Sequence, residues 1–257
     1  MIRAKFVATL ALAATLGVGA ASAADLAGWP NKAPVMSYPV YNWAGFYVGG
    51  HLGGSWTNQI WTNTANTSGF GDLIPGQGFG QHGSGVFGGG QIGYNWQASN
   101  YVFGLEGTIS AMDNRGGLLN RIFGPAKDDL FSWRTNWMAT ITGRTGIAVN
   151  NNLFYVKGGY AGASSHMSVV DVVPPLVGSG SDTRWHNGAT VGAGWEYGIT
   201  RNWIVGLEYD YAAFKTRSYQ LAGTAPGPYS FDAKPRDVQS AVARLSYKFS
   251  GPLVTKY

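Results

Sequence analysis

The sequence holds one pair of residues whose types and spacing fit nucleophilic catalysis. His166 and Ser168 form a His-x-Ser pair, in which an imidazole could act as the base that activates a serine hydroxyl toward an ester. No further residues of an acyl-transfer site surround the pair, and neighbouring His and Ser are common by chance in polar segments. We therefore expect a protein without enzymatic activity.

A metal or heme site would need histidines or cysteines that converge. Cysteine is absent, and no two histidines are spaced like the ligands of a metal-binding segment. Three histidines could still meet in space at one rim of the fold and hold a cation or heme, although scattered polar residues are the favoured interpretation. We expect no metal and no cofactor. The histidines are His51, His82, His166 and His186, of which the last three are the rim candidates.

Composition excludes several classes of protein. Charged residues make up 12% of the 257 residues, whereas aromatic residues make up 14% and glycine counts 39. A soluble chain carries roughly 25% charged residues, and a disordered chain would not be rich in aromatic residues. The formal net charge of +5 is scattered rather than grouped, so nucleic acid is not an expected partner.

The N-terminus has the pattern of a secretory signal peptide. Basic residues precede an apolar stretch at 6–20, and small residues at 21–23 supply a cleavage site between Ala23 and Ala24. The following stretch, 24–42, contains three prolines and no periodicity, so we expect an extended periplasmic arm. The predicted organisation is a signal peptide at 1–23, this arm, a barrel at 43–249 and a tail at 250–257.

Long alternating segments separated by turns dominate the rest of the chain. Each exceeds the roughly 9–11 residues that a tilted strand needs to cross a bilayer. Short connections alternate with long ones, as in an up-and-down barrel of the outer membrane. We therefore predict an all-β fold, an eight-stranded antiparallel transmembrane β-barrel. The segments are 43–56, 83–97, 101–112, 131–149, 153–166, 184–197, 203–215 and 236–249, and the long loops are 57–82, 113–130, 167–183 and 216–235.

Alternation within each segment separates an apolar face from a polar one. In the segment 131–149, Trp133 and Trp137 fall on the apolar face and Arg134 falls on the polar face. The polar faces are largely Gly, Thr and Ser, too poor in charge for a surface in water, so we expect the apolar faces to point outward into lipid. Aromatic residues beside the short turns predict an interfacial girdle. They are Trp96, Tyr101, Phe154, Tyr197 and Trp203.

The polar faces would place five charged side chains at a similar height in the lumen. Charges in a narrow lumen are costly unless they are partnered, so we predict the pairs Glu106–Arg144 and Glu208–Arg244, with Lys157 beside them. Eight strands enclose a space that side chains can fill. A plugged lumen is therefore favoured over a narrow selective conduit.

Four stretches carry a resemblance to a known family. They are 41–49 (YNWAGFYVG), 88–97 (GGGQIGYNWQ), 103–107 (FGLEG) and 244–249 (RLSYKF). They resemble strands of the small outer-membrane barrel proteins of the rhizobia and Brucella, the porin-family outer-membrane immunogenic proteins. The resemblance implies an abundant, surface-exposed barrel with an envelope-integrity or porin-like role, and some relatives bind hemin through surface loops. One departure is that the chain continues past Phe249, so either Phe249 or Tyr257 closes the last strand.

We expect a structural, porin-like protein in the outer membrane of a Gram-negative bacterium, with both termini periplasmic. Its partners would be outer-membrane lipid and lipopolysaccharide, and the four long loops could bind a surface ligand. In loop 57–82, Trp61 and Phe70 are either exposed contacts or folded back onto the rim. The alternatives are a hemin-type binding protein and, through His166 and Ser168, a lipid-A-modifying enzyme.

Overall fold

The structure, a computed structural model, describes residues 41–66, 76, 78–119, 129–171, 179–223 and 229–249. The predicted cleavage site at Ala23 and Ala24, most of the predicted arm and the tail lie outside these ranges. Within the described ranges, no helix is long and apolar enough to span a membrane. The strands are β1 (Gly45–Asn66), β2 (Gly78–Ala98), β3 (Tyr101–Leu119), β4 (Asp129–Val149), β5 (Asn152–Asp171), β6 (Ser179–Gly198), β7 (Trp203–Phe214), β8 (Arg217–Gly223) and β9 (Tyr229–Lys248).

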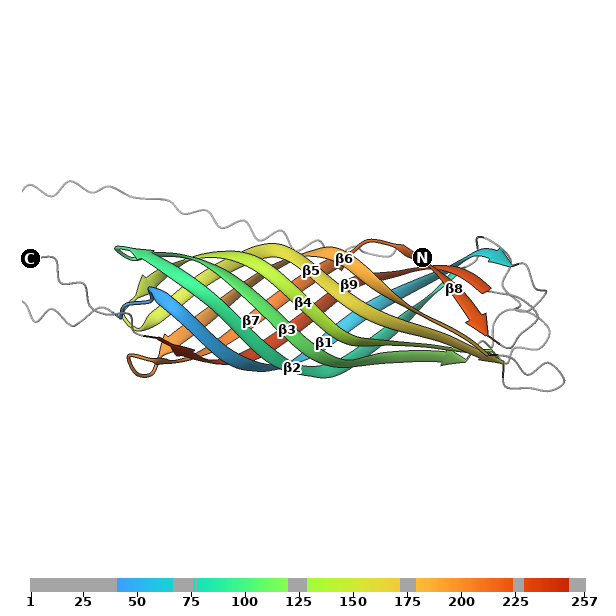
Figure 1. The fold of residues 1–257 in the computed structure, drawn as a ribbon, viewed down its shortest axis with the longest axis horizontal. Coiled ribbons are helices and arrows are strands. Elements are labelled where there is room, and N and C mark those ends of the chain that lie inside the picture. The colour runs from blue at the N-terminus through green and yellow to red at the C-terminus, as the bar shows by residue number, and fades with distance from the viewer. Residues whose placement is uncertain are drawn as a thin grey trace, which may run out of the picture. The chain divides into compact units, whose positions relative to one another are not determined.

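Eight of these strands close into a ring (Figure 1). The strands from β1 to β7 pair antiparallel in chain order, β7 pairs with β9, and β9 returns to β1 along a ladder that begins at Tyr47 and Lys248. The short strand β8 pairs with β9 and with β6, the two neighbours of β7, so it continues the position of β7 toward the loop end. The predicted eight-stranded antiparallel barrel is confirmed, with β8 as an addition that was not predicted.

The short turns lie together at one end of the barrel, on the left in Figure 1. Ser99 and Asn150 occupy the left-handed region there, with φ of 56° and 53°, a conformation typical of two-residue hairpin turns. The described ends of the chain return to the same end, where the Phe249 amide donates to the Phe46 carbonyl at 2.8 Å. We call this the turn end and the opposite end the loop end.

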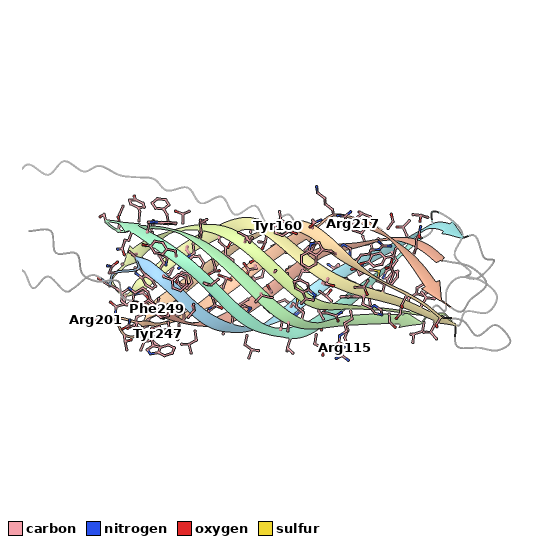
Figure 2. The ribbon with its side chains drawn as sticks, viewed as in Figure 1. Arg115, Tyr160, Arg201, Arg217, Tyr247 and Phe249 are labelled. Carbon is pink, nitrogen blue, oxygen red and sulfur yellow. The ribbon has the colours of Figure 1, made fainter. Side chains whose placement is uncertain are left out.

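Large apolar side chains cover the outside of the barrel along most of its length (Figure 2). Ile141 and Leu207, for example, are 67% and 59% exposed, whereas polar and charged residues of the same strands are buried. This arrangement is the reverse of a soluble protein and fits a wall in contact with lipid. The predicted outward orientation of the apolar faces is confirmed. The five predicted girdle residues all lie on this outer face beside the short turns, from 39% exposed at Tyr197 to 55% at Phe154.

Toward the loop end the strands run further than predicted, and the apolar side chains turn inward. The loop expected at 57–82 is partly strand, because β1 continues to Asn66 and β2 begins at Gly78. Trp61 is fully buried and packs edge-on against Phe131, with 5.8 Å between the ring centres. Of the two interpretations left open for Trp61, the exposed loop contact is therefore wrong, and the burial agrees with a ring that folds back. Phe70 lies outside the described residues. The long wall extends beyond lipid into water, where apolar side chains are more stable inside the barrel.

A β-bulge produces this inversion in β4. The β4–β5 register shifts between Thr135 and Trp137, which leaves Asn136 without an opposing residue. One extra residue reverses the alternation of faces beyond it. Trp133, predicted to point outward with Trp137, is therefore buried, and Arg134, predicted to face the lumen, is exposed.

Candidate functional site: the ionic layer of the lumen

Seven charged side chains meet in one layer across the lumen. The alternation of each strand points them inward, and all but Asp210 are at most 7% exposed. Three are cations and four are carboxylates, so the layer has nearly balanced charge. They are Glu106 on β3, Arg144 on β4, Lys157 on β5, Glu196 on β6, Glu208 and Asp210 on β7, and Arg244 on β9.

Arg144 makes the best-defined contact of the layer. Its two terminal nitrogens, Nη1 and Nη2, donate to the two carboxylate oxygens of Glu196 at 2.9 and 3.0 Å, and its Nε donates to the side-chain oxygen of Asn95 at 3.0 Å. A planar guanidinium facing a carboxylate in this way forms one of the stronger polar contacts in proteins. Because β5 lies between β4 and β6, the pair spans an intervening strand.

Arg244 and Lys157 connect the remaining carboxylates. Arg244 donates to Glu106 and to Glu208, which lie on strands from opposite sides of β9 in the ring. Lys157 Nζ donates to Glu208 Oε1 at 2.6 Å and lies 3.2 Å from Asp210. Each buried charge therefore has at least one opposite charge close by, which offsets its loss of hydration.

Two tyrosines complete the network. The Tyr47 hydroxyl donates to Glu106 at 2.7 Å, and the Tyr155 hydroxyl donates to Glu208 at 2.5 Å. Their rings also lie beside the guanidinium of Arg144, whose central carbon is 5.0 and 4.8 Å from the two ring centres. Cations at this distance from an aromatic face are attracted to it.

Glycines provide the room that these large side chains need. A Cβ atom at Gly93 would collide with the Tyr47 hydroxyl, and one at Gly194 would collide with the Tyr155 ring. The absence of a side chain on one strand therefore lets a long side chain from another strand cross the lumen at full length.

The structure brings together all five charged residues singled out in the sequence. The expected pair Glu208–Arg244 is present, but Arg144 takes Glu196 as its two-pronged partner and lies 3.7 Å from Glu106. Sequence reasoning missed the roles of Glu196 and Asp210, although both alternate onto the polar faces of their segments. Glu196 lies only two residues from the end of β6, so a count of residues from the turns puts it nearer the turn end than the other charged residues. Arg144 still reaches it, because its long side chain extends toward the turn end.

The turn end of the lumen is closed by residues that precede β1. Trp43 is fully buried; its amide donates to the Gln97 side chain at 2.7 Å, and its carbonyl accepts from Asn95. The Tyr41 ring packs against it, with 4.6 Å between the ring centres. Burial, together with the nearby Glu196 carboxylate, raises the pKa of Tyr41 to about 12, so its hydroxyl stays neutral.

The lumen is also filled on the loop side of the ionic layer. A cavity of about 30 Å³ adjoins the layer, lined in part by His51, Ser110 and Asp210, and it has room for about two water molecules. Beyond it lies an apolar cluster that includes Phe87 and Phe214. Aromatic, ionic and apolar layers thus follow one another along the axis.

The candidate catalytic and rim histidines are held by separate neighbours. His82 contacts Asn58, and His186 contacts the Tyr219 hydroxyl at 2.5 Å inside the barrel. His166, the residue of the His-x-Ser pair, contacts Thr183 at 2.8 Å. Within the described part of the chain, no three His, Cys, Asp or Glu residues are grouped to hold a metal ion.

Comparison with known proteins places this barrel among its relatives. A family model described as "Outer membrane protein beta-barrel domain" matches residues 10–249. The chain belongs to this family. The barrel therefore sits among the lipids of a Gram-negative outer membrane, where short turns of such barrels face the periplasm. The resemblance stated from the sequence is confirmed.

Named relatives agree with this assignment. The chain is similar to the 25 kDa outer-membrane immunogenic protein of Brucella canis, with 27% identity over 223 residues that cover 86% of this chain and 85% of the relative. It is 31% identical over 194 residues to the 22 kDa outer membrane protein of Rhizobium leguminosarum bv. viciae, covering 74% and 72% of the two chains. The outer membrane protein OprG from Pseudomonas aeruginosa shares the fold, with a TM-score of 0.53, 11% identity and coverage of 81% and 97%.

Proposed function

We propose that this protein is a structural, porin-like barrel of the outer membrane whose lumen is closed to free diffusion. The supporting observation is the ionic layer, because its contacts cross the lumen rather than following the wall. Arg144 of β4 reaches Glu196 of β6, and Arg244 of β9 reaches Glu106 of β3. A solute moving along the axis would have to separate these buried ion pairs, each of which is costly to break.

The layers on either side support the same function. Trp43 occupies the periplasmic mouth, and the apolar cluster around Phe87 lies on the extracellular side of the ionic layer. An eight-stranded barrel is narrow enough for side chains to fill. Its contribution to the envelope would then come from the wall itself and from the extracellular loops. Binding of a ligand by these loops stays a prediction.

Planar-bilayer conductance tests this proposal. The wild-type protein should show no steady large-conductance steps. A variant with Trp43→Ala, Arg144→Ser and Glu196→Ser removes the mouth closure and one ion pair while keeping the charge balance, and it should show increased ion leak. Arg201→Ser, on the exposed β6–β7 turn, is the control and should match the wild type. Steady large steps from the wild type, similar to those of the triple variant, would refute a closed lumen.

A further inference from the structure

A shallow hollow with basic walls lies on the outer surface of the barrel. It has a volume of about 420 Å³ and is lined by Arg115, Arg134 and His166, among others. Gly117 also lines it on the exposed face of β3, and because it carries no side chain the space beside Arg115 stays open. Arg115 projects from the outer wall toward the loop end (Figure 2). The residues come from the neighbouring strands β3, β4 and β5.

The hollow lies where the hydrocarbon of the membrane ends. The apolar band of an outer-membrane barrel is about 25 Å tall, and a strand tilted by about 40° climbs about 2.5 Å per residue, so the band takes about ten residues. On β4 such a run leads from Ile147 to Trp137, both exposed on the outer face. Arg134 follows just beyond the bulge at Asn136. Its guanidinium is therefore at the height of the lipid headgroups of the outer leaflet.

The charges of the hollow do not cancel. Arg115 and Arg134 both contact Asp113, and the Arg134–Asp113 distance is 3.4 Å. One carboxylate thus holds two guanidinium groups side by side and balances only one of their charges. Both arginine side chains stay more than half exposed, at 63% and 54%. His166 adds an imidazole whose Nδ1 is engaged with Thr183.

We propose that this hollow binds a phosphate group of lipopolysaccharide in the outer leaflet. Guanidinium groups match the oxygen geometry of phosphate and bind it with two parallel hydrogen bonds. The bulge at Asn136 gives the hollow its second arginine, because regular alternation would turn Arg134 into the lumen. The proposal concerns the outer wall and does not depend on whether the lumen is closed.

Binding of purified lipid A to the full-length protein in detergent tests the proposal. The probes are bisphosphorylated lipid A and the same lipid after enzymatic removal of its phosphates, measured by native mass spectrometry. The double variant Arg115→Gln/Arg134→Gln should bind the phosphorylated lipid about tenfold more weakly than the wild type, and Arg134→Gln alone about threefold. Raising the salt concentration should also weaken wild-type binding.

The control is Arg201→Gln, which removes the same charge from the turn end of the barrel (Figure 2) and should bind like the wild type. Mobility of unboiled samples on gels confirms that each variant is folded. Equal binding of phosphorylated and dephosphorylated lipid would overturn the proposal, because phosphate would then not be recognised. Unchanged binding by the double variant, or an equal loss in Arg201→Gln, would overturn it as well.

Discussion

The contact between Arg144 and Glu196 offers the sharpest test of the ionic layer. Exchanging Arg144 for methionine keeps a side chain of similar length but removes its two hydrogen bonds to Glu196 and the one to Asn95. Glu196 would then have Arg244, 4.0 Å away, as its nearest charged contact of opposite sign in the described layer. Exchanging Glu196 for leucine leaves Arg144 with Glu106 at 3.7 Å.

The expected loss of stability follows from the burial of the pair, since Arg144 and Glu196 are only 5% and 2% exposed. Removing one partner of a buried ion pair costs about 3–5 kcal/mol, because the other charge stays buried without its partner. Each single variant should therefore lose about that much free energy of unfolding. The double variant Arg144→Met/Glu196→Leu leaves no orphaned charge at this contact. Its main loss is the donor to Asn95, worth about 1–3 kcal/mol. The double variant should thus lose at least about 3 kcal/mol less than the sum of the singles.

Urea unfolding of the protein refolded in lipid vesicles measures these free energies through tryptophan fluorescence. The matched control is the exposed pair Asp113–Arg115, where Arg115→Met should leave the urea midpoint unchanged. If the two lumen substitutions were additive, the two residues would act independently and the reasoning about a coupled layer would be refuted. A cost in Arg144→Met no larger than that of the exposed control would refute it equally.

Three further changes test other parts of the barrel. Trp43→Ala should lower the free energy of unfolding by about 3–5 kcal/mol in a urea titration, since the indole is fully buried; an unchanged midpoint would contradict its role in closing the mouth. Gly93→Val should reduce the folded fraction on unboiled gels, because its Cβ would meet the Tyr47 hydroxyl. Gly143→Val, with open space around it, should fold normally. Equal folding of the two variants would contradict the packing of the lumen. In vesicles with brominated acyl chains, a variant retaining only Trp137 should be quenched and one retaining only Trp61 should not, and the opposite result would reverse the assigned faces.

Much of the fold could be predicted from local patterns. Alternation with a period of two, interrupted by short and long connections in turn, requires only that successive strands pair with their neighbours. The outward direction of Leu207 and Ile141 followed from the low charge of the opposite faces. These features depend only on single segments and their ends, so they can be predicted without knowing how the strands are arranged in space.

Features that depend on register and tilt could not be predicted. The partner of Arg144 is decided by how far its side chain reaches along a tilted barrel, so a count of residues from each turn missed Glu196. The outward direction of Arg134 depends on one bulge residue, Asn136, which a simple alternation does not reveal. Trp61 looked like a loop residue because the strands were expected to end with the membrane.

The closure of the periplasmic mouth also bears on the order of assembly. Lys248, near the end of the last strand, donates to the carbonyl of Asn42 and lies over the ring of Tyr41, 4.6 Å from its centre. The Tyr41 hydroxyl reaches the Arg201 carbonyl in the β6–β7 turn. These partners come together only after the final strand has docked against the first. The contacts of Tyr41 and Asn42 with Lys248 therefore connect the start of the barrel to its last strand, and they can form only once the seam between β9 and β1 is closed.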